Sequence, residues 1–287
     1  MGKSAPQFSS LFLVRGKVDS LESRTYDRDP LGFRPFLQRT AEVGLGPEEA
    51  PTLVFLHEGL GSASSWRDFA PRLATETGCG ALVYSRAGYG ASDPAPPHWP
   101  VRFMHDEAII LAAVLDAMAI QEPILVGHSD GASIALIYTG SAPKIEPKAL
   151  ALEAPHVFVE PLTVASIAKL PGRYAEGDLE RKLRRQHGDN TDRTFHAWTE
   201  VWLSPAFRNW DSQEYLPGVG CPVLIVQGER DEYGTLRQVE AITASVAGPV
   251  ETVILANSGH SPHRERPGET FQAMARFLRK VLSDRYY

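Results

Sequence analysis

The sequence is poor in cysteine, since its 287 residues include only Cys79 and Cys221. Two cysteines in a chain of this length form no disulfide framework, and this pair lacks the close spacing of a zinc motif. Histidines and carboxylates also show no ligand spacing on one element, so we predict no metal. We predict no other cofactor, because Gly88-Tyr89-Gly90 is only part of a dinucleotide-binding pattern.

Long hydrophobic runs are also missing. No apolar stretch reaches the ~18 residues that a membrane span requires, and the N-terminal region lacks the apolar segment of a signal peptide. The formal net charge of −6 argues against a nucleic-acid partner. The basic run at residues 181–185 is typical of the solvated face of a helix. We therefore expect a soluble, cytoplasmic protein that acts on a small molecule; the sequence says nothing of its oligomeric state.

Short apolar runs alternate with longer helical patterns, which is typical of an α/β protein with a mostly parallel sheet flanked by helices. The predicted strands cover residues 52–56, 81–84, 124–126, 149–152, 223–226 and 252–255. Residues 11–14 and 36–43 are further strand candidates for an N-terminal hairpin or meander, and residues 20–33 have the composition of a loop. Apolar spacing predicts two helices, one through Met104, Ala108, Leu111, Leu115 and Met118 and one through Phe271, Met274, Phe277, Leu278 and Val281.

The regular alternation breaks over residues 156–217. This segment has a charged helical pattern, a polar turn at residues 188–190 and a group of aromatic residues: Phe195, Trp198, Trp202, Phe207 and Trp210. The simplest interpretation is that the aromatics form the core of a helical insertion, with some of them, Trp198 and Trp202 among our candidates, lining a pocket. We therefore predict a first core part (1–155), a helical lid or cap (156–217) that follows the sixth strand, and a second core part (218–287).

The most informative motif is Gly127-His128-Ser129-Asp130-Gly131, which lies between a predicted strand and a predicted helix. This is the G-x-S-x-G pattern in strand–turn–helix context. Glycines on both sides permit a sharp turn that exposes the serine hydroxyl, and the helix that follows directs its free N–H groups toward a nearby anion. The alternative is an ordinary turn capped by a serine. The context favours a nucleophile.

A serine hydroxyl needs a base to accept its proton and a third group to orient that base. Asp231 comes just past the strand at 223–226, so it lies at the same sheet edge as Ser129, where ligands bind in open α/β sheets. Glu229 and Glu232 are the alternative acids. The spacing between strand and loop favours Asp231.

His260 follows the strand at 252–255 and the turn that ends in Gly259, so it is the best candidate for the base. Three other histidines compete with it. His128 lies within the elbow and is expected to point away from the serine oxygen, His263 lies further along at a helix start, and His57 follows an earlier strand.

Five segments together resemble the α/β-hydrolase fold family over about residues 36–283. They are His57-Glu58-Gly59-Leu60-Gly61, residues 85–92, the elbow at Ser129, residues 228–231, and Gly259-His260 with Glu265-Arg266-Pro267. The resemblance implies Ser129 as nucleophile, His260 as general base and then acid, and Asp231 as the orienting carboxylate.

The resemblance also implies an oxyanion hole, which requires two N–H groups. Asp130, the residue after the nucleophile, would supply one of them, and Gly59 is the best candidate for the other. Many relatives have His-Gly where this chain has His57-Glu58. The Glu58 carboxylate would disfavour an anion if it pointed inward, or it could face away, hold a loop by hydrogen bonds or bind a polar substrate group. The Asp130 carboxyl group is the second acid beside the nucleophile.

These residues favour a serine hydrolase that forms an acyl-enzyme with small to medium carboxylic esters or lactones carrying apolar or aromatic groups. The resemblance also admits a hydrolase that cleaves carbon–carbon bonds in aromatic meta-cleavage products. It disfavours haloalkane dehalogenases and epoxide hydrolases, because they carry aspartate where this chain has Ser129. A hypothesis of a different class is a ligand-binding sensor of the same fold with slow or no turnover.

Overall fold

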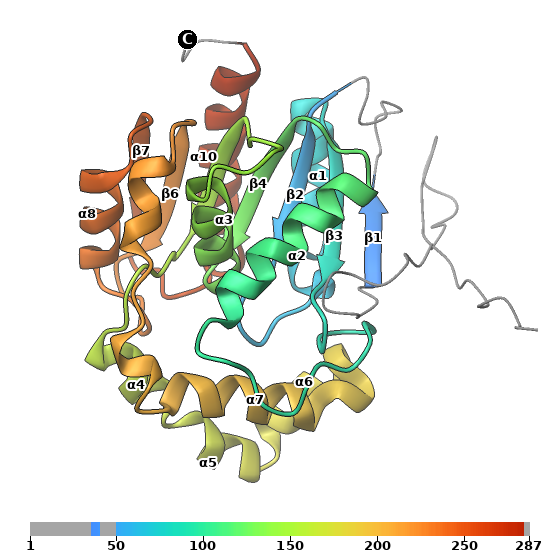
Figure 1. Ribbon diagram of the computed structural model, residues 1–287, viewed down its shortest axis with the longest axis vertical. Helices are drawn as coiled ribbons and strands as arrows, with labels where there is room; N and C mark the ends of the chain where they lie inside the picture. The colour runs from blue at the N-terminus through green and yellow to red at the C-terminus, as the bar shows by residue number, and fades with distance from the viewer. Residues whose placement is uncertain (1–35, 41–49, 284–287) are drawn as a thin grey trace, which may run out of the picture.

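The computed structural model describes residues 36–40 and 50–283, and at its centre is a seven-stranded sheet (Figure 1). The strands are β1 (Phe36–Thr40), β2 (Thr52–Leu56), β3 (Gly80–Ser85), β4 (Pro123–His128), β5 (Ala149–Glu153), β6 (Val223–Gly228) and β7 (Val250–Leu255). Their spatial order is β1-β3-β2-β4-β5-β6-β7; β1 pairs antiparallel with β3 and the other pairings are parallel. The predicted mostly parallel sheet is confirmed. Residues 11–14, 20–33 and 41–43 lie outside the described residues.

The central strands are buried on both faces of the sheet. Successive residues of a strand point to opposite sides: Val54 and Leu56 of β2 join one hydrophobic cluster, while Leu53 and Phe55 join another. Burial on two sides explains the continuous apolar runs that predicted these strands. β7 lies at the edge of the sheet, and its burial is accordingly partial.

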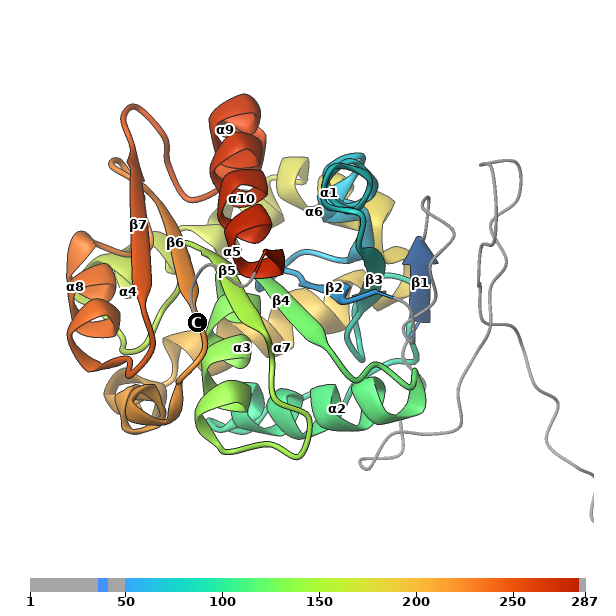
Figure 2. The same ribbon diagram turned by 90° about the horizontal axis from the view of Figure 1, so that it is seen from above.

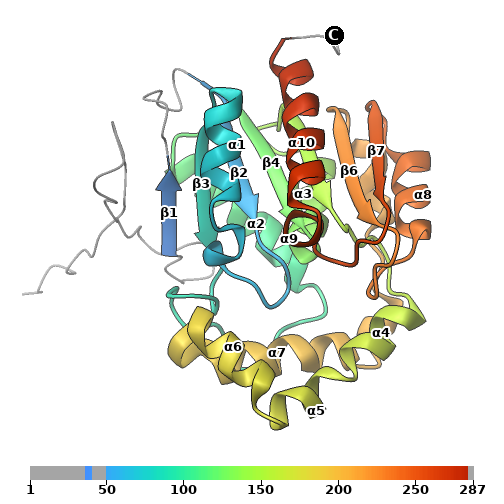
Figure 3. The same cartoon turned by 180° about the vertical axis from the view of Figure 1, so that it is seen from behind.

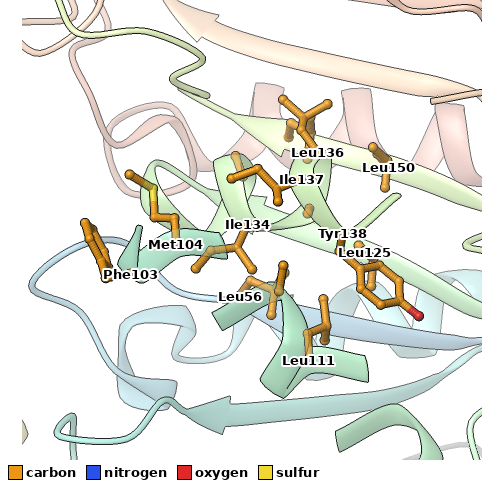
Figure 4. Close-up of a cluster of buried hydrophobic side chains, with 14 of the residues drawn as sticks. Leu56, Phe103, Met104, Leu111, Leu125, Ile134, Leu136, Ile137, Tyr138 and Leu150 are labelled. Atoms are coloured by element: carbon orange, nitrogen blue, oxygen red, sulfur yellow. The ribbon is translucent and has the colours of Figure 1, made fainter. Parts of the chain in front are cut away.

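Helices cover both faces of the sheet (Figures 2 and 3). One hydrophobic cluster holds residues of α2 (Phe103–Ala117), α3 (Asp130–Gly140) and α8 (Leu236–Ser245), and the other holds residues of α1 (Phe69–Thr77) and α10 (Pro267–Leu282). In Figure 4, Leu56 of β2 lies near Ile134 of α3 and Leu111 of α2, and Leu125 of β4 lies near Tyr138 of α3. The two helices predicted from apolar spacing correspond to α2 and α10.

Four helices between β5 and β6 lie across the edge at which the parallel strands end (Figures 1 and 3). These cap helices are α4 (Pro161–Ile167), α5 (Leu170–Ala175), α6 (Asp178–His187) and α7 (Thr191–Leu203). They follow the fifth strand of the described chain, whereas the sequence count placed them after the sixth because it included residues 11–14. Arg181 and Arg185 of α6 are exposed, as the basic run predicted.

The cap helices are joined to the loop after β3 by buried hydrogen bonds. The Gly90 N–H donates to Nδ1 of His187 over 2.9 Å, and Nδ2 of Asn190 donates to the Ser92 carbonyl over 2.8 Å. The Thr194 hydroxyl donates to the Gly88 carbonyl. A segment that sequence reasoning treated only as a structural loop therefore supports α6 and α7.

The remaining short elements are η1 (Ala63–Trp66), η2 (Gly188–Asn190), η3 (Phe207–Asn209), η4 (Gln213–Gly218) and α9 (Pro262–Glu265). Within residues 36–40 and 50–283, no helix has the length and apolar character needed to cross a membrane.

Candidate active site

Ser129 occupies a sharp turn between β4 and α3. Its φ of 53° and ψ of −119° are strained for a residue with a side chain. The glycines on either side make the turn possible: a Cβ on Gly127 would lie 2.6 Å from the Cα of Ala132, and a Cβ on Gly131 would overlap the Leu56 carbonyl group. The G-x-S-x-G pattern thus corresponds to a steric requirement for close packing between the turn, α3 and β2.

The structure brings Ser129, His260 and Asp231 into one hydrogen-bonded chain. Nε2 of His260 lies 2.9 Å from Oγ of Ser129, and Nδ1 of His260 lies 2.9 Å from both carboxylate oxygens of Asp231. Of the alternative acids, Glu229 instead accepts a long hydrogen bond from the Asn257 N–H, and Glu232 is exposed. Asp231 is therefore the acid that reaches His260.

Asp231 is held in a polar niche within an otherwise buried site. Its carboxylate accepts hydrogen bonds from Nε2 of Gln227 (2.8 Å) and from the N–H groups of Tyr233 (2.8 Å) and Gly234 (3.2 Å). Burial alone would raise the pKa of Asp231. The neighbouring His260 and the N–H donors outweigh it and lower this pKa to about 2. Asp231 is thus a stable anion that fixes the orientation of the imidazole.

The three competing histidines are directed to other partners. Nε2 of His128 donates to the His260 carbonyl over 2.7 Å, and Nδ1 of His263 lies 2.8 Å from Oε2 of Glu153. Nε2 of His57 accepts from the Arg86 N–H over 3.1 Å. His128 therefore supports the loop that carries His260, in agreement with its expected structural role.

Gly59 and Asp130 line the same cavity as Ser129. Among the described residues, neither of their N–H groups donates to a protein acceptor. For Asp130 this follows from its position as the first residue of α3, where an N–H has no partner within the helix. Both residues predicted for the oxyanion hole are thus adjacent to the serine with free donors.

Glu58 lies in the loop that follows β2. Its carboxylate accepts from Oγ of Ser65 (3.2 Å) and from a guanidinium nitrogen of Arg264 (3.0 Å), and it lies 3.6 Å from Nδ1 of His128. Burial opposes its ionisation, but His128 and Arg264 hold the pKa of Glu58 well below its usual range. Arg86 donates to the Glu58 carbonyl over 3.1 Å. These contacts match the loop-holding alternative, although Glu58 also lines the cavity.

The Asp130 carboxyl group is buried and faces the cap helices. Its Oδ2 accepts a hydrogen bond of 2.8 Å from Nε1 of Trp198 in α7. Burial raises the pKa of Asp130, while the charge of Arg86 and the bond from Trp198 oppose that rise. Trp202 is the next aromatic residue along the same face of α7, and both tryptophans line the cavity.

The cavity over Ser129 has a volume of about 230 Å³. Its lining includes residues that sequence reasoning missed, namely His156, Thr163, Ile167, Leu170, Tyr233 and Ser261. His156 could have been found, because it lies just past the end of β5, at the same sheet edge as Asp231 and His260. The aliphatic residues come from the short helices α4 and α5, which have no strong periodic signal.

The described residues include no group of three or more histidine, cysteine or acidic side chains placed to hold a metal ion.

Comparison with known proteins places this geometry in a family. The model of the alpha/beta hydrolase family matches residues 53–273. This range includes nearly all of β2, the strands β3 to β7, the elbow and the loops that carry Asp231 and His260. The chain belongs to the alpha/beta hydrolase family. The resemblance seen in the sequence is thereby confirmed, and the coarse assignment is a hydrolase of this fold.

Individual relatives of this hydrolase are distant. Epoxide hydrolase A of Mycobacterium tuberculosis is 23% identical over 84% of this chain and 94% of its own length. A 2-succinyl-6-hydroxy-2,4-cyclohexadiene-1-carboxylate synthase of Salmonella paratyphi B is 26% identical over 82% of this chain and 96% of its own. A thermophilic esterase structure from Thermogutta terrifontis covers 90% of this chain and 98% of its own, with 19% identity and a TM-score of 0.69. At that identity, the structural likeness indicates the fold alone.

Proposed function

We propose that this protein is a serine hydrolase that cleaves small carboxylic esters or lactones through an acyl-enzyme. The observation that carries the proposal is the chain of hydrogen bonds from Ser129 through His260 to Asp231. This chain of hydrogen bonds contains the three groups needed to activate a serine hydroxyl: the nucleophile, a base within hydrogen-bond reach, and a buried carboxylate that orients the base.

In the proposed mechanism, Oγ of Ser129 attacks the substrate carbonyl while Nε2 of His260 accepts the hydroxyl proton. Asp231 stabilises the imidazolium that forms and itself stays ionised, consistent with its low pKa. His260 then donates the proton to the departing alcohol oxygen, which leaves an ester between Ser129 and the acyl group. Water, deprotonated by His260, attacks this ester. His260 then returns the proton to Oγ of Ser129 as the bond between Oγ and the acyl carbon breaks, which releases the acid and the free serine.

The negative oxygen formed in each attack would accept hydrogen bonds from the N–H groups of Gly59 and Asp130. Preorganised donors of this kind stabilise the transition state more than the ground state, and one donor contributes about 10²- to 10³-fold in rate. The N-terminal end of α3 adds the favourable field of its helix dipole. Glu58 is held by Arg264 and Ser65, which lessens its conflict with this anion.

Cavity size and lining support the substrate class. A volume of about 230 Å³ is below the usual range for drug-sized ligands, so a short acyl group fits best. Ile167, Leu170 and Trp202 supply apolar surface from the cap helices, and we propose that residues 156–217 act as the lid over the site. The charged side chains in the lining are Glu58, Asp130 and Glu232, and lysine and arginine are missing from it. Neutral substrates are therefore favoured over anionic ones.

This charge pattern also bears on the alternative of carbon–carbon bond hydrolysis. The meta-cleavage products in question are dienoates, which carry a carboxylate. A cavity lined by three acidic residues disfavours their binding.

A single experiment tests the proposal. A fluorophosphonate probe is expected to label the wild-type protein but not Ser129→Ala, and p-nitrophenyl acetate and butyrate are expected to turn over faster than a dienoate ring-cleavage product or an acyl-CoA thioester. Turnover of the dienoate alone would favour the carbon–carbon hydrolase. Absence of labelling in the folded wild type would favour a ligand-binding sensor.

A further inference from the structure

Trp198, in the middle of cap helix α7, touches both residues of the proposed oxyanion hole. Its indole N–H donates to Oδ2 of Asp130 over 2.8 Å. Its ring also lies directly against Gly59, because a Cβ on that glycine would be only 2.5 Å from Cε2 and 2.7 Å from Cζ2 of the indole. One side chain from the cap helices thus contacts two core loops that meet beside Ser129.

The contact with Asp130 constrains a buried group. Asp130 is fully buried, and its other carboxylate oxygen, Oδ1, lies within hydrogen-bond distance of no donor among the described residues. Trp198 therefore donates the 2.8 Å hydrogen bond to this side chain, and Trp202, on the same face of α7, also interacts with it. A buried carboxyl group that loses such a donor tends to reorient. Because Asp130 is the first residue of α3, reorientation of its side chain disturbs the N–H beside the nucleophile.

The contact with Gly59 constrains the opposite donor. Gly59 lies in the turn after β2, where the Gly61 N–H donates to the Glu58 carbonyl over 3.1 Å. The indole edge formed by Nε1, Cε2 and Cζ2 occupies the space that a side chain on Gly59 would need. Removal of these indole atoms would leave the turn that carries Gly59 without its packing contact from the cap helices.

We infer that Trp198 is a positioning residue that holds the Gly59 and Asp130 N–H groups in place, so that the oxyanion hole is complete only while α7 is seated on the core. This inference rests on the proposed serine mechanism. It assigns the cap helices a role in transition-state stabilisation in addition to covering the substrate. The hydrogen bonds that the loop after β3 donates to His187 and accepts from Asn190 and Thr194 would keep α7 in that position.

The test compares Trp198→Phe with Trp210→Phe. Phenylalanine keeps an aromatic ring but removes the indole N–H, and the buried Trp210 is a matched control because its own N–H has no partner in the described structure. We expect Trp198→Phe to lower kcat by about 10- to 100-fold with KM within about threefold, since a misplaced donor acts in the transition state. A trifluoromethyl ketone, which forms an oxyanion on Ser129, should bind more weakly by a similar factor. Trp210→Phe should stay within about twofold in each measurement.

Substitutions at Asp130 provide a second test of the same hydrogen bond. Asp130→Asn keeps an oxygen that accepts from Trp198, so it should retain more activity than Asp130→Ala. The double variant Trp198→Phe/Asp130→Ala should be about as slow as the slower single variant, because both changes break the same bond.

Three results would overturn the inference. A rise in KM at constant kcat for Trp198→Phe would mean that Trp198 only lines the pocket. Equal losses in Trp198→Phe and Trp210→Phe would indicate general loosening of the cap helices. Failure of the wild type to react with fluorophosphonate would rule out the serine mechanism, and with it this inference. Labelling of every variant would instead show that Ser129 is still a nucleophile, so that a loss of kcat can be attributed to the oxyanion hole.

Discussion

The imidazole rings of His156 and His260 lie face to face, with centroids 5.5 Å apart and planes inclined by 10°. Tyr233 and His128 approach His260 from other sides, at 4.7 and 5.2 Å between ring centroids. Burial, together with the charge of His260, lowers the pKa of His156 to about 4. A neutral His156 allows His260 to carry a proton during the reaction without a like charge stacked against it.

The first prediction concerns the stability of the fold in mild acid. His156 ionises near pH 6.5 when unfolded and near pH 4 when folded, so its contribution is present above pH 6.5 and is lost as the pH falls toward 4. We expect the free energy of unfolding of the wild type to fall over this range by about 2–3 kcal/mol more than that of His156→Phe, which keeps an aromatic ring there. Urea unfolding at several pH values measures the difference. Parallel curves for the two proteins would contradict it.

The second prediction identifies the acid. Asp231→Asn removes the charge that orients and stabilises the His260 imidazolium, so kcat should fall by about 10³- to 10⁴-fold with little change in fold. Glu229→Gln is the control, because Glu229 follows the same strand and has no hydrogen bond to His260. Ester hydrolysis assays compare the two, and comparable losses in both variants would mean that Asp231 has no special role.

Site residues could be predicted from the sequence where the evidence for them lies in a few neighbouring residues, and could not where it depends on contacts between distant segments. Ser129 and Asp231 each follow a buried apolar run, His260 follows an apolar run at the edge of the sheet, and parallel strands bring their carboxyl ends to one edge. The contact between Trp198 and Asp130 joins residues 68 positions apart, and that between His263 and Glu153 joins residues 110 apart. Periodicity predicts which face of a helix is buried but not which partner it meets. Glu58 illustrates this: its direction depends on Arg264, far along the chain.

The third prediction concerns the buried pair of Glu153 and His263. The carboxylate accepts from both Nδ1 (2.8 Å) and the N–H (3.1 Å) of His263, while the Glu153 carbonyl accepts from the Ser129 N–H over 2.9 Å. The pair therefore links the elbow to the segment after His260. His263→Leu removes the imidazole partner of a buried carboxylate and leaves it only the backbone N–H of residue 263, so it should lower the free energy of unfolding by about 3 kcal/mol.

The control for that prediction is His98→Leu. His98 pairs with Glu200 on the surface, with 82% of its side chain exposed, and such pairs contribute little. Glu153→Leu/His263→Leu should recover part of the loss, since neither charge is then buried. Chemical denaturation measures these three variants together with Glu153→Leu. A double variant whose loss equals the sum of the losses of Glu153→Leu and His263→Leu would show that the two side chains do not stabilise each other.

The fourth prediction gives the pH range in which this pair contributes. Burial disfavours the charged form of both residues, but each side chain stabilises the charge of the other. As a result, the pKa of Glu153 is lowered from 4.5 and the pKa of His263 is raised from 6.5. The contribution of Glu153 is present above pH 4.5 and is lost as the pH falls through its folded pKa. That of His263 is present below pH 6.5 and is lost as the pH rises through its folded pKa. The destabilisation caused by His263→Leu should thus be largest between about pH 4.5 and 6.5, and a loss that grows above that range would contradict the assignment.

The last prediction tests the steric reading of the elbow. A methyl group on Gly131 would overlap the Leu56 carbonyl group of the neighbouring strand, so α3 must move away from β2 in Gly131→Ala. Overpacking of a rigid contact costs about 1–3 kcal/mol and more when backbone atoms collide. Gly172→Ala is the matched control, because a Cβ there meets nothing within 4 Å and alanine favours the helix by about 0.5–1 kcal/mol. Thermal unfolding should show a lower Tm for Gly131→Ala and an unchanged or higher Tm for Gly172→Ala. If Gly131→Ala keeps both its Tm and its reaction with fluorophosphonate, close packing of α3 against β2 is not what positions Ser129.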